Sequence, residues 1–128
     1  MYILHAEDND DMVELVKLVF CNLCKEVNIV SARDGISAFH EFRIKEKIPE
    51  GQEYSAIITD YDMPNMTGAE LAKLIREEYD PHVPIFLHTS KNILELAERM
   101  DIDVVVPKDQ VFDLVRQVMR ILGIHKDA

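Results

Sequence analysis

The sequence predicts a doubly wound α/β fold of five strand–helix units, (βα)₅, with a parallel five-stranded sheet. Short apolar or β-branched runs alternate along the chain with segments in which apolar residues recur at helical spacing. Turn-forming residues separate these segments, and the chain contains no internal repeat or low-complexity stretch. Strands that alternate with helices favour a parallel sheet covered on both faces, and right-handed crossovers leave few topologies.

The first half of the chain contains two such units. Residues 2–6 and 27–31 are short apolar or β-branched runs, which predict the first two strands. Between them, the capping sequence Asn9-Asp10-Asp11 and the helical spacing of apolar residues from Met12 to Leu23 predict a helix. A break at Asp34-Gly35 opens the second expected helix. Its apolar stripe is Ile36, Phe39 and Phe42.

The second half continues the alternation. Residues 55–59 form an apolar run that predicts the third strand, after a loop at residues 49–52. Thr67 and Glu70 have the spacing of a capping box, which predicts the start of the third helix. Two further strands and two further helices are expected at residues 85–88, 93–100, 103–106 and 111–122.

Length and charge bound the class of protein. At 128 residues the chain is expected to be a single domain, residues 1–128, with no output domain. Its formal net charge of −10 argues against a nucleic-acid-binding surface and against binding to anionic membranes. The start of the chain lacks the basic and apolar regions of a signal peptide, and no apolar run reaches membrane-spanning length. We therefore expect a cytoplasmic protein.

Cys21 and Cys24 form a C-x-x-C motif, which is typical of redox pairs and of half zinc sites. The motif lies near the end of an expected helix, where the helix N-terminus cannot activate a thiolate. No second cysteine pair completes a zinc site. We therefore expect two reduced thiols, as in most cytoplasmic proteins.

Acidic residues follow two of the expected strands. Asp60 ends the third strand, and Glu7-Asp8 follow the first strand directly. Open α/β sheets carry their chemistry at the carboxyl ends of their strands, so neighbouring strands would bring these carboxylates into one crevice. Two like charges about 4 Å apart repel by roughly 4 kcal/mol at an effective dielectric constant of about 20. A hard divalent cation with oxygen ligands, such as Mg²⁺, would relieve this repulsion.

Two more polar residues follow the last two strands. Lys108 comes after the fifth strand and would add a fixed positive charge, and Thr89 comes after the fourth strand with a hydroxyl group. A carboxylate beside Mg²⁺ and an ammonium group is arranged to attack a phosphoryl group in line. The conjunction of these residues at four strand ends predicts that Asp60 accepts a phosphoryl group and that Thr89 bonds the product.

The chain resembles the receiver domain of two-component response regulators over essentially its whole length. The resemblance rests on the acidic pair after the first strand, the segment from Asp60 to Pro64 with Gly68 after it, Thr89-Ser90, and Pro107-Lys108-Asp109. All four motifs occur in the order that the family has. The resemblance implies a flavodoxin-like sheet with strand order 2-1-3-4-5.

The resemblance also implies a role for each site residue. Asp60 would be the phosphoacceptor and would bind Mg²⁺ together with Asp8 and the backbone carbonyl of Asp62, while Glu7 would act mainly through water. Lys108 would pair with the phosphoryl group, and Thr89 would move to bond it. Asp62 and Lys91 would tune the lifetime of the phosphoryl group.

The implied protein is a stand-alone phosphorylated switch of a bacterial two-component system rather than a turnover enzyme. A sensor histidine kinase or a phosphotransfer protein would donate the phosphoryl group. A downstream protein would bind the face of the fourth helix, the fifth strand and the fifth helix. The switch is expected to be monomeric, with dimerisation on phosphorylation left open.

The chain departs from the family pattern in three places. Val105 stands where the family often has an aromatic residue on the fifth strand, three residues before the lysine. Pro107 precedes Lys108, whereas the family usually has proline after the lysine. The segment from Thr89 to Lys108 is a few residues short, which predicts a short or displaced fourth helix. The route by which a signal leaves Asp60 is therefore open.

His5 and His88 lie within expected apolar strands, where the family usually has aliphatic residues. We expect buried neutral rings that bond to the backbone. A pH-sensing role remains an alternative because small shifts move the pKa of histidine across the physiological range. A phosphohistidine role is disfavoured because the interior of a strand gives a donor no access.

Two other functions fit parts of the pattern. The D-x-D of Asp60 and Asp62 also suits phosphatases of the haloacid dehalogenase type. Pro64 and the early position of the acid pair oppose that class, and the chain lacks a cap domain. A degenerate receiver that binds partners without phosphate is the second alternative. The complete set of acids, threonine and lysine argues against it.

Overall fold

The computed structural model describes residues 1–90 and 101–125. The strands are β1 (Tyr2–Ala6), β2 (Asn28–Ala32), β3 (Tyr54–Thr59), β4 (Ile85–Thr89) and β5 (Val104–Pro107). The helices within these residues are α1 (Asp10–Leu23), α2 (Gly35–Ile44), α3 (Gly68–Glu78) and α5 (Val111–Leu122). The expected helix at residues 93–100 and the expected tuning residue Lys91 lie outside the described part of the chain.

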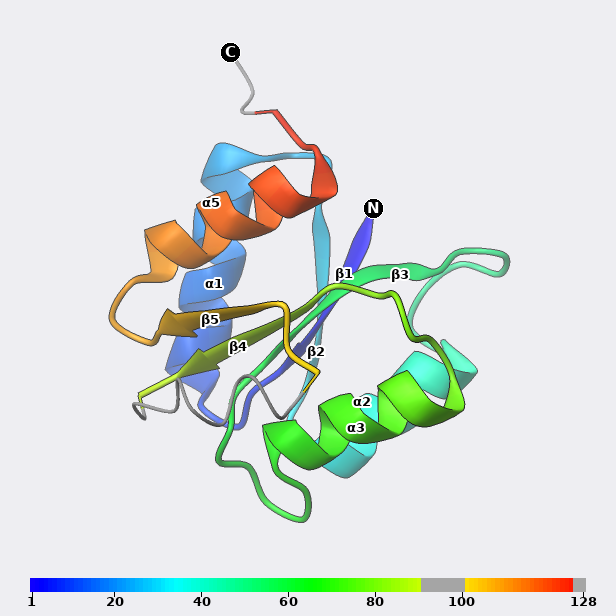
Figure 1. Ribbon diagram of the computed structural model, residues 1–128. Helices are drawn as coiled ribbons and strands as arrows, with labels where there is room; N and C mark the ends of the chain where they lie inside the picture. The colour runs from blue at the N-terminus through cyan, green and yellow to red at the C-terminus, as the bar shows by residue number, and fades with distance from the viewer. Residues whose placement is uncertain (91–100, 126–128) are drawn as a thin grey trace.

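The five strands form one parallel sheet in the order β2-β1-β3-β4-β5 (Figure 1), which confirms the predicted order. Four of the strands begin or end one residue away from the predicted bounds. Pro107 is the last residue of β5, where it pairs with Thr89. A proline is tolerated there because β5 is an edge strand.

Side chains cap the starts of the first three helices, as the sequence predicts for α1 and α3. The Asn9 side chain accepts a hydrogen bond from the Met12 N–H at 3.0 Å, which starts α1. The Asp34 side chain accepts one from the Ser37 N–H at 2.7 Å, which starts α2. Thr67 and Glu70 form both bonds of the capping box that starts α3.

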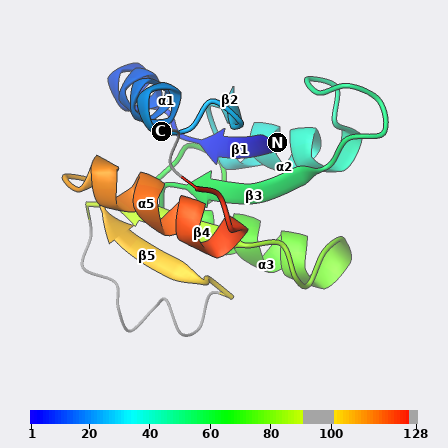
Figure 2. The ribbon, with the colours of Figure 1, turned by 90° about the horizontal axis from the view of Figure 1, so that it is seen from above.

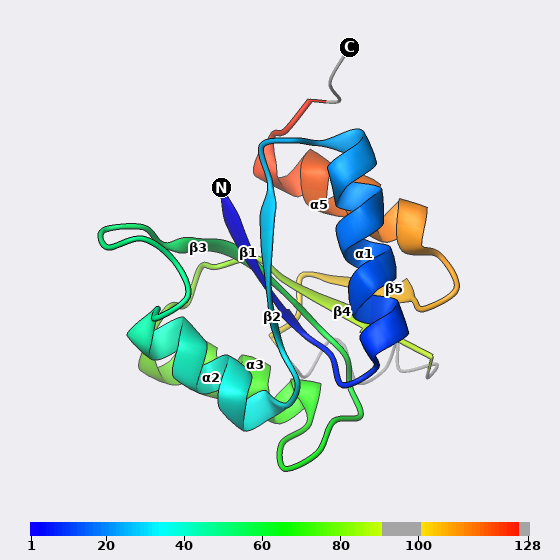
Figure 3. The same cartoon turned by 180° about the vertical axis from the view of Figure 1, so that it is seen from behind.

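Helices cover both faces of the sheet. Helices α1 and α5 pack together on one face, and α2 and α3 pack together on the other (Figures 2 and 3). Neighbouring residues of one strand enter opposite cores, so Ile57 belongs to the α2–α3 core and Ile58 to the α1–α5 core. Both side chains are fully buried. This two-sided burial explains why the strands read as continuous apolar runs.

Within the described residues, no helix is both long enough and apolar enough to span a bilayer. The sheet instead serves as a rigid platform. Its parallel strands end at a common edge, where the polar residues of the sequence motifs follow.

Candidate functional site

The backbone hydrogen bonds of the sheet continue beyond the strand ends into the residues of the site. The Asp60 N–H donates to the Ala6 carbonyl at 3.0 Å, and the Glu7 N–H donates to the Ala32 carbonyl at 2.9 Å. The Lys108 N–H donates to the Thr89 carbonyl at 3.0 Å. Each residue is therefore fixed to the last residue of the neighbouring strand, which places its side chain with the accuracy of the sheet.

The side chains of Glu7, Asp60 and Lys108 meet at this edge. The Lys108 Nζ lies 2.8 Å from Asp60 Oδ2 and 2.8 Å from Glu7 Oε1. The second oxygen of each carboxylate is held by the backbone: Asp60 Oδ1 accepts from the Tyr61 N–H at 2.7 Å, and Glu7 Oε2 accepts from the Asn9 N–H at 3.2 Å. One ammonium group thus bridges two buried, oriented carboxylates.

Burial and charge oppose each other in this cluster. Only 1% of Glu7 is exposed, and desolvation raises the pKa of its carboxyl group, although Lys108 and the Asn9 N–H counteract this. Burial alone would lower the pKa of Lys108, but its bonds to Asp60 and Glu7 outweigh burial and raise that pKa. Lys108 is therefore the fixed cation of the site.

The acids of the cluster fit a hard divalent cation. Glu7, Asp8 and Asp60 each present a carboxylate oxygen within 4.8 Å of the others, and Asp8 is exposed to solvent. Three carboxylates face one ammonium group, so an uncompensated negative charge remains when all are ionised. All-oxygen donors with an open, solvent-facing side match the preference of Mg²⁺ for a few carboxylates and retained water.

The start of α3 lies directly against the phosphoacceptor candidate. The Gly68 N–H donates to the Tyr61 carbonyl at 2.8 Å. A Cβ atom at Gly68 would lie 2.2 Å from the Asp60 carbonyl oxygen, which is far inside contact distance. Only glycine permits this approach, and the positive end of the α3 dipole is thereby brought close to the acids.

The other predicted site residues lie at the same edge, with fewer described contacts. Thr89 is the last residue of β4 rather than the residue after it, and 2% of it is exposed. Asp62 is exposed in the loop after Asp60, and the role of its carbonyl as a metal ligand stays a prediction. Sequence reasoning did not single out Tyr61, although an aromatic residue directly after a strand-end acid was a visible signal.

His5 and His88 are fully buried, and both lie on the face of the sheet that α1 and α5 cover. The expectation of a backbone bond is wrong for His5, because neither of its ring nitrogens has a hydrogen-bond partner within the described residues. For His88, an interaction with the Lys108 backbone partly counteracts the fall in its pKa. Burial lowers the pKa of His5 to about 3, helped by His88 and Lys108. Burial also lowers the pKa of His88 to about 4, helped by Lys108. Both rings are therefore neutral at physiological pH.

This pair predicts a loss of stability in mild acid. The pKa of each histidine is lower in the folded protein than in the unfolded chain, so the unfolded chain binds more protons below about pH 6.5. Each ring then costs up to about 1.4 kcal/mol of unfolding free energy per pH unit as the pH falls toward its folded pKa. Urea unfolding at pH 7 and pH 5 should show this loss, and it should shrink strongly in His5→Leu/His88→Leu. An equal loss in the double variant would contradict the assignment.

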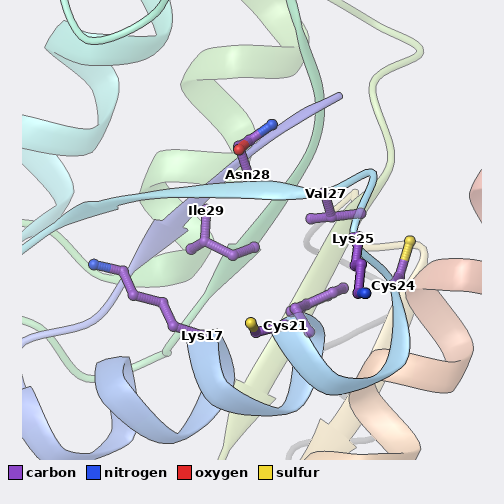
Figure 4. A pocket seen from close by; sticks show the side chains of 8 residues that line it. Lys17, Cys21, Cys24, Lys25, Val27, Asn28 and Ile29 are labelled. Carbon is purple, nitrogen blue, oxygen red and sulfur yellow. The ribbon is translucent and has the colours of Figure 1, made fainter.

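The C-x-x-C motif lies at the end of α1, away from the cluster of Glu7, Asp60 and Lys108. Cys21 and Cys24 are free thiols, as expected, and they line a pocket of about 460 Å³ between the end of α1 and the start of β2 (Figure 4). Their sulfur atoms point in different directions. Within residues 1–90 and 101–125, the only group of three or more potential metal ligands is Glu7, Asp8 and Asp60. The described part of the chain therefore gives the cysteines no zinc site.

Comparison with known proteins agrees with the geometry. Residues 3–118 match the response regulator receiver domain, and the chain belongs to this family. It is 31% identical over 103 residues to the two-component response regulator ARR6 of Arabidopsis thaliana. That match covers 77% of this chain and 55% of ARR6, so the chain spans about half the length of this relative.

Solved receiver domains share the fold. The receiver domain of the Francisella response regulator 1452 superposes with a TM-score of 0.80 at 19% identity, covering 95% of this chain and 96% of that one. The receiver domain of the sensor histidine kinase PA1611 from Pseudomonas aeruginosa, solved with a magnesium ion in its active site cleft, gives a TM-score of 0.76 at 24% identity. That superposition covers 95% of this chain and 97% of that one.

Proposed function

We propose that this receiver domain is a phosphorylated switch in which Asp60 accepts a phosphoryl group from a phosphohistidine of a sensor histidine kinase or a phosphotransfer protein. The observation that carries the proposal is the Lys108 ammonium group, 2.8 Å from both Asp60 and Glu7 at the carboxyl edge of the sheet. Burying two carboxylates with a single ammonium group carries a desolvation cost, and a role of these charges in phosphoryl transfer would explain why the fold retains them.

The proposed transfer is a displacement at phosphorus. A carboxylate oxygen of Asp60 forms the new P–O bond while the P–N bond to the donor imidazole breaks and its electron pair stays on the nitrogen. Asp60 becomes an acyl phosphate, and the donor histidine becomes neutral. Lys108 stabilises the negative charge on the transferred oxygens, and the hydroxyl group of Thr89 bonds the product.

Glu7, Asp8 and Asp60 would hold Mg²⁺, with the Asp62 carbonyl as a further ligand. When bound, the ion would neutralise charge on the phosphoryl oxygens. The chemistry of the donor set supports this part of the proposal, and the magnesium ion in the related PA1611 receiver is consistent with it.

The proposed output is a changed surface rather than a released product, so the protein would act as a switch and not as a turnover enzyme. A downstream protein would recognise the face formed by the fourth helix, β5 and α5. Because its phosphodonor is an intracellular kinase or phosphotransfer protein, the proposal includes a cytoplasmic location.

The test is an intact-mass measurement. The protein is incubated with Mg²⁺ and acetyl phosphate, and its mass is followed with time. We expect one phosphoryl adduct that decays slowly, that needs Mg²⁺, and that is absent in Asp60→Asn. Asp62→Asn is the matched control, because it makes the same chemical change in the same loop and should retain the adduct.

Two outcomes would contradict the proposal. Steady consumption of acetyl phosphate without an adduct would indicate a hydrolase. No adduct at any donor concentration, together with no binding of beryllofluoride, would indicate a binding module that does not use phosphate.

A further inference from the structure

Tyr61 is attached to Asp60 by more than the chain. Its backbone N–H donates to Asp60 Oδ1 at 2.7 Å, and its carbonyl accepts the Gly68 N–H at 2.8 Å. The peptide groups on both sides of Tyr61 are therefore set by the Asp60 carboxylate and by the first residue of α3. A change in the charge or position of that carboxylate acts on Tyr61 directly.

The side chain of Tyr61 links the Asp60 loop to the strands β4 and β5. It packs against the fully buried Leu87 of β4, and so do the partly buried side chains of Ala69, Ile102 and Val105. This small cluster joins the start of α3, the middle of β4 and the strand β5. It shares Ile102 with the core between the sheet and α2–α3, and its other members belong to neither main core, so a shift in this cluster reaches that core through Ile102.

We propose that Tyr61 is the positioning residue through which phosphorylation of Asp60 reaches β4 and β5, an inference that rests on the function proposed above. A carboxylate oxygen is a stronger hydrogen-bond acceptor than either oxygen of the carboxyl end of an acyl phosphate. Phosphorylation of Oδ2 would weaken the bond from the Tyr61 N–H, and phosphorylation of Oδ1 would remove its acceptor. In both cases the Asp60 side chain holds the Tyr61 N–H less firmly, and the Tyr61 ring shifts against Leu87.

This route accounts for the place where the chain departs from its family. Val105 occupies the position on the fifth strand where an aromatic residue is frequent. Its small side chain cannot swing between two positions as an aromatic ring can. Tyr61 supplies an aromatic ring to the same cluster around Leu87. Its backbone N–H is bonded directly to the phosphoacceptor Asp60. In this route the Tyr61 ring moves first, and Val105 moves in response to it.

The test compares amide resonances in ¹H–¹⁵N spectra with and without saturating Mg²⁺ and beryllofluoride, a mimic of the phosphoryl group. Saturation is judged in each variant from the amides of Ala6 and Asp60. In the native protein, the mimic should shift these site amides and also the amides of Ile102 and Val105. Tyr61→Leu, which keeps apolar volume but lacks the ring, should lose most of the shift at Ile102 and Val105. Tyr61→Phe should restore it.

Tyr79→Leu is the matched control, because it makes the same substitution at the far end of α3, where the ring contacts Phe39 instead of this cluster. It should keep the native response. Native shifts at Ile102 and Val105 in a Tyr61→Leu protein whose site amides respond would overturn the inference alone. A native protein that shows neither site shifts nor a mass adduct would overturn the proposed function and this inference with it.

Discussion

Replacing Lys108 with methionine is expected to lower the unfolding free energy at pH 7 by about 2–4 kcal/mol, somewhat less than the loss of one partner from a fully buried ion pair. The substitution leaves the carboxylates of Glu7 and Asp60 facing each other without the ammonium group that lies 2.8 Å from both. The Lys108 side chain is 21% exposed, so water will recover part of the cost. The same variant should form the Asp60 adduct far more slowly, because the countercharge for the phosphoryl oxygens is gone.

The loss should depend on pH in a defined direction. Desolvation already raises the pKa of Glu7 from 4.5, and Lys108 counteracts this, so removing Lys108 raises that pKa further. An acid with a raised folded pKa destabilises the fold above that pKa, and the penalty disappears as the pH falls toward the unfolded value. The difference in unfolding free energy between Lys108→Met and the native protein should therefore shrink from pH 7 to pH 5.

Urea unfolding of both proteins at the two pH values measures this difference. Lys108 also helps to lower the pKa values of His5 and His88, so its removal raises both, which shrinks the difference in the same direction. Lys108→Arg is the control, because it keeps the positive charge and should retain most of the stability. A difference that stays constant or grows as the pH falls would show that Lys108 stabilises the fold by packing instead of by charge.

The residues of this cluster were predictable from the sequence for a physical reason. Glu7, Asp60 and Lys108 directly follow short apolar runs that predict strands, and parallel strands end at one edge. The hydrogen-bond ladder extends one residue beyond the strands and fixes these residues in place. The position of a residue that is hydrogen-bonded to the sheet can be predicted from the sequence, because the regular geometry of the strands determines where that residue lies.

The contacts that the sequence did not predict depend on the path of loops and on packing between neighbouring strands. The contact of Gly68 with the Asp60 carbonyl oxygen arises because the loop turns back over the strand end, and eight residues of sequence do not encode that turn visibly. The packing of Tyr61 on Leu87 has the same origin. The ring of His5 was expected to bond to the backbone, but the strands around it use their backbone groups in the ladder.

The contact at Gly68 makes the second large effect calculable. Gly68→Ala places a Cβ atom 2.2 Å from the Asp60 carbonyl oxygen and 3.1 Å from its carbonyl carbon, and both belong to the backbone. Neither the strand end nor the start of α3 can yield cheaply, because the ladder holds one and the capping box holds the other. We expect a loss of about 2–3 kcal/mol of unfolding free energy, at the upper end of the cost of overpacking.

The same displacement should also slow phosphorylation of Asp60, by more than the loss of stability alone would explain. A movement of the Asp60 backbone by a few tenths of an ångström misaligns its carboxylate with Lys108, and small misplacements of reacting groups cost roughly tenfold to a hundredfold in rate. Urea unfolding and the rate of adduct formation with acetyl phosphate measure the two effects. Gly51→Ala is the control: its φ of 85° strains an alanine, but no atom lies within 4 Å of the new Cβ. That variant should lose only about 1 kcal/mol and phosphorylate at the native rate. Because Gly68 does not have a positive φ, equal losses in the two variants would mean that the approach of α3 to Asp60 does not add the expected cost.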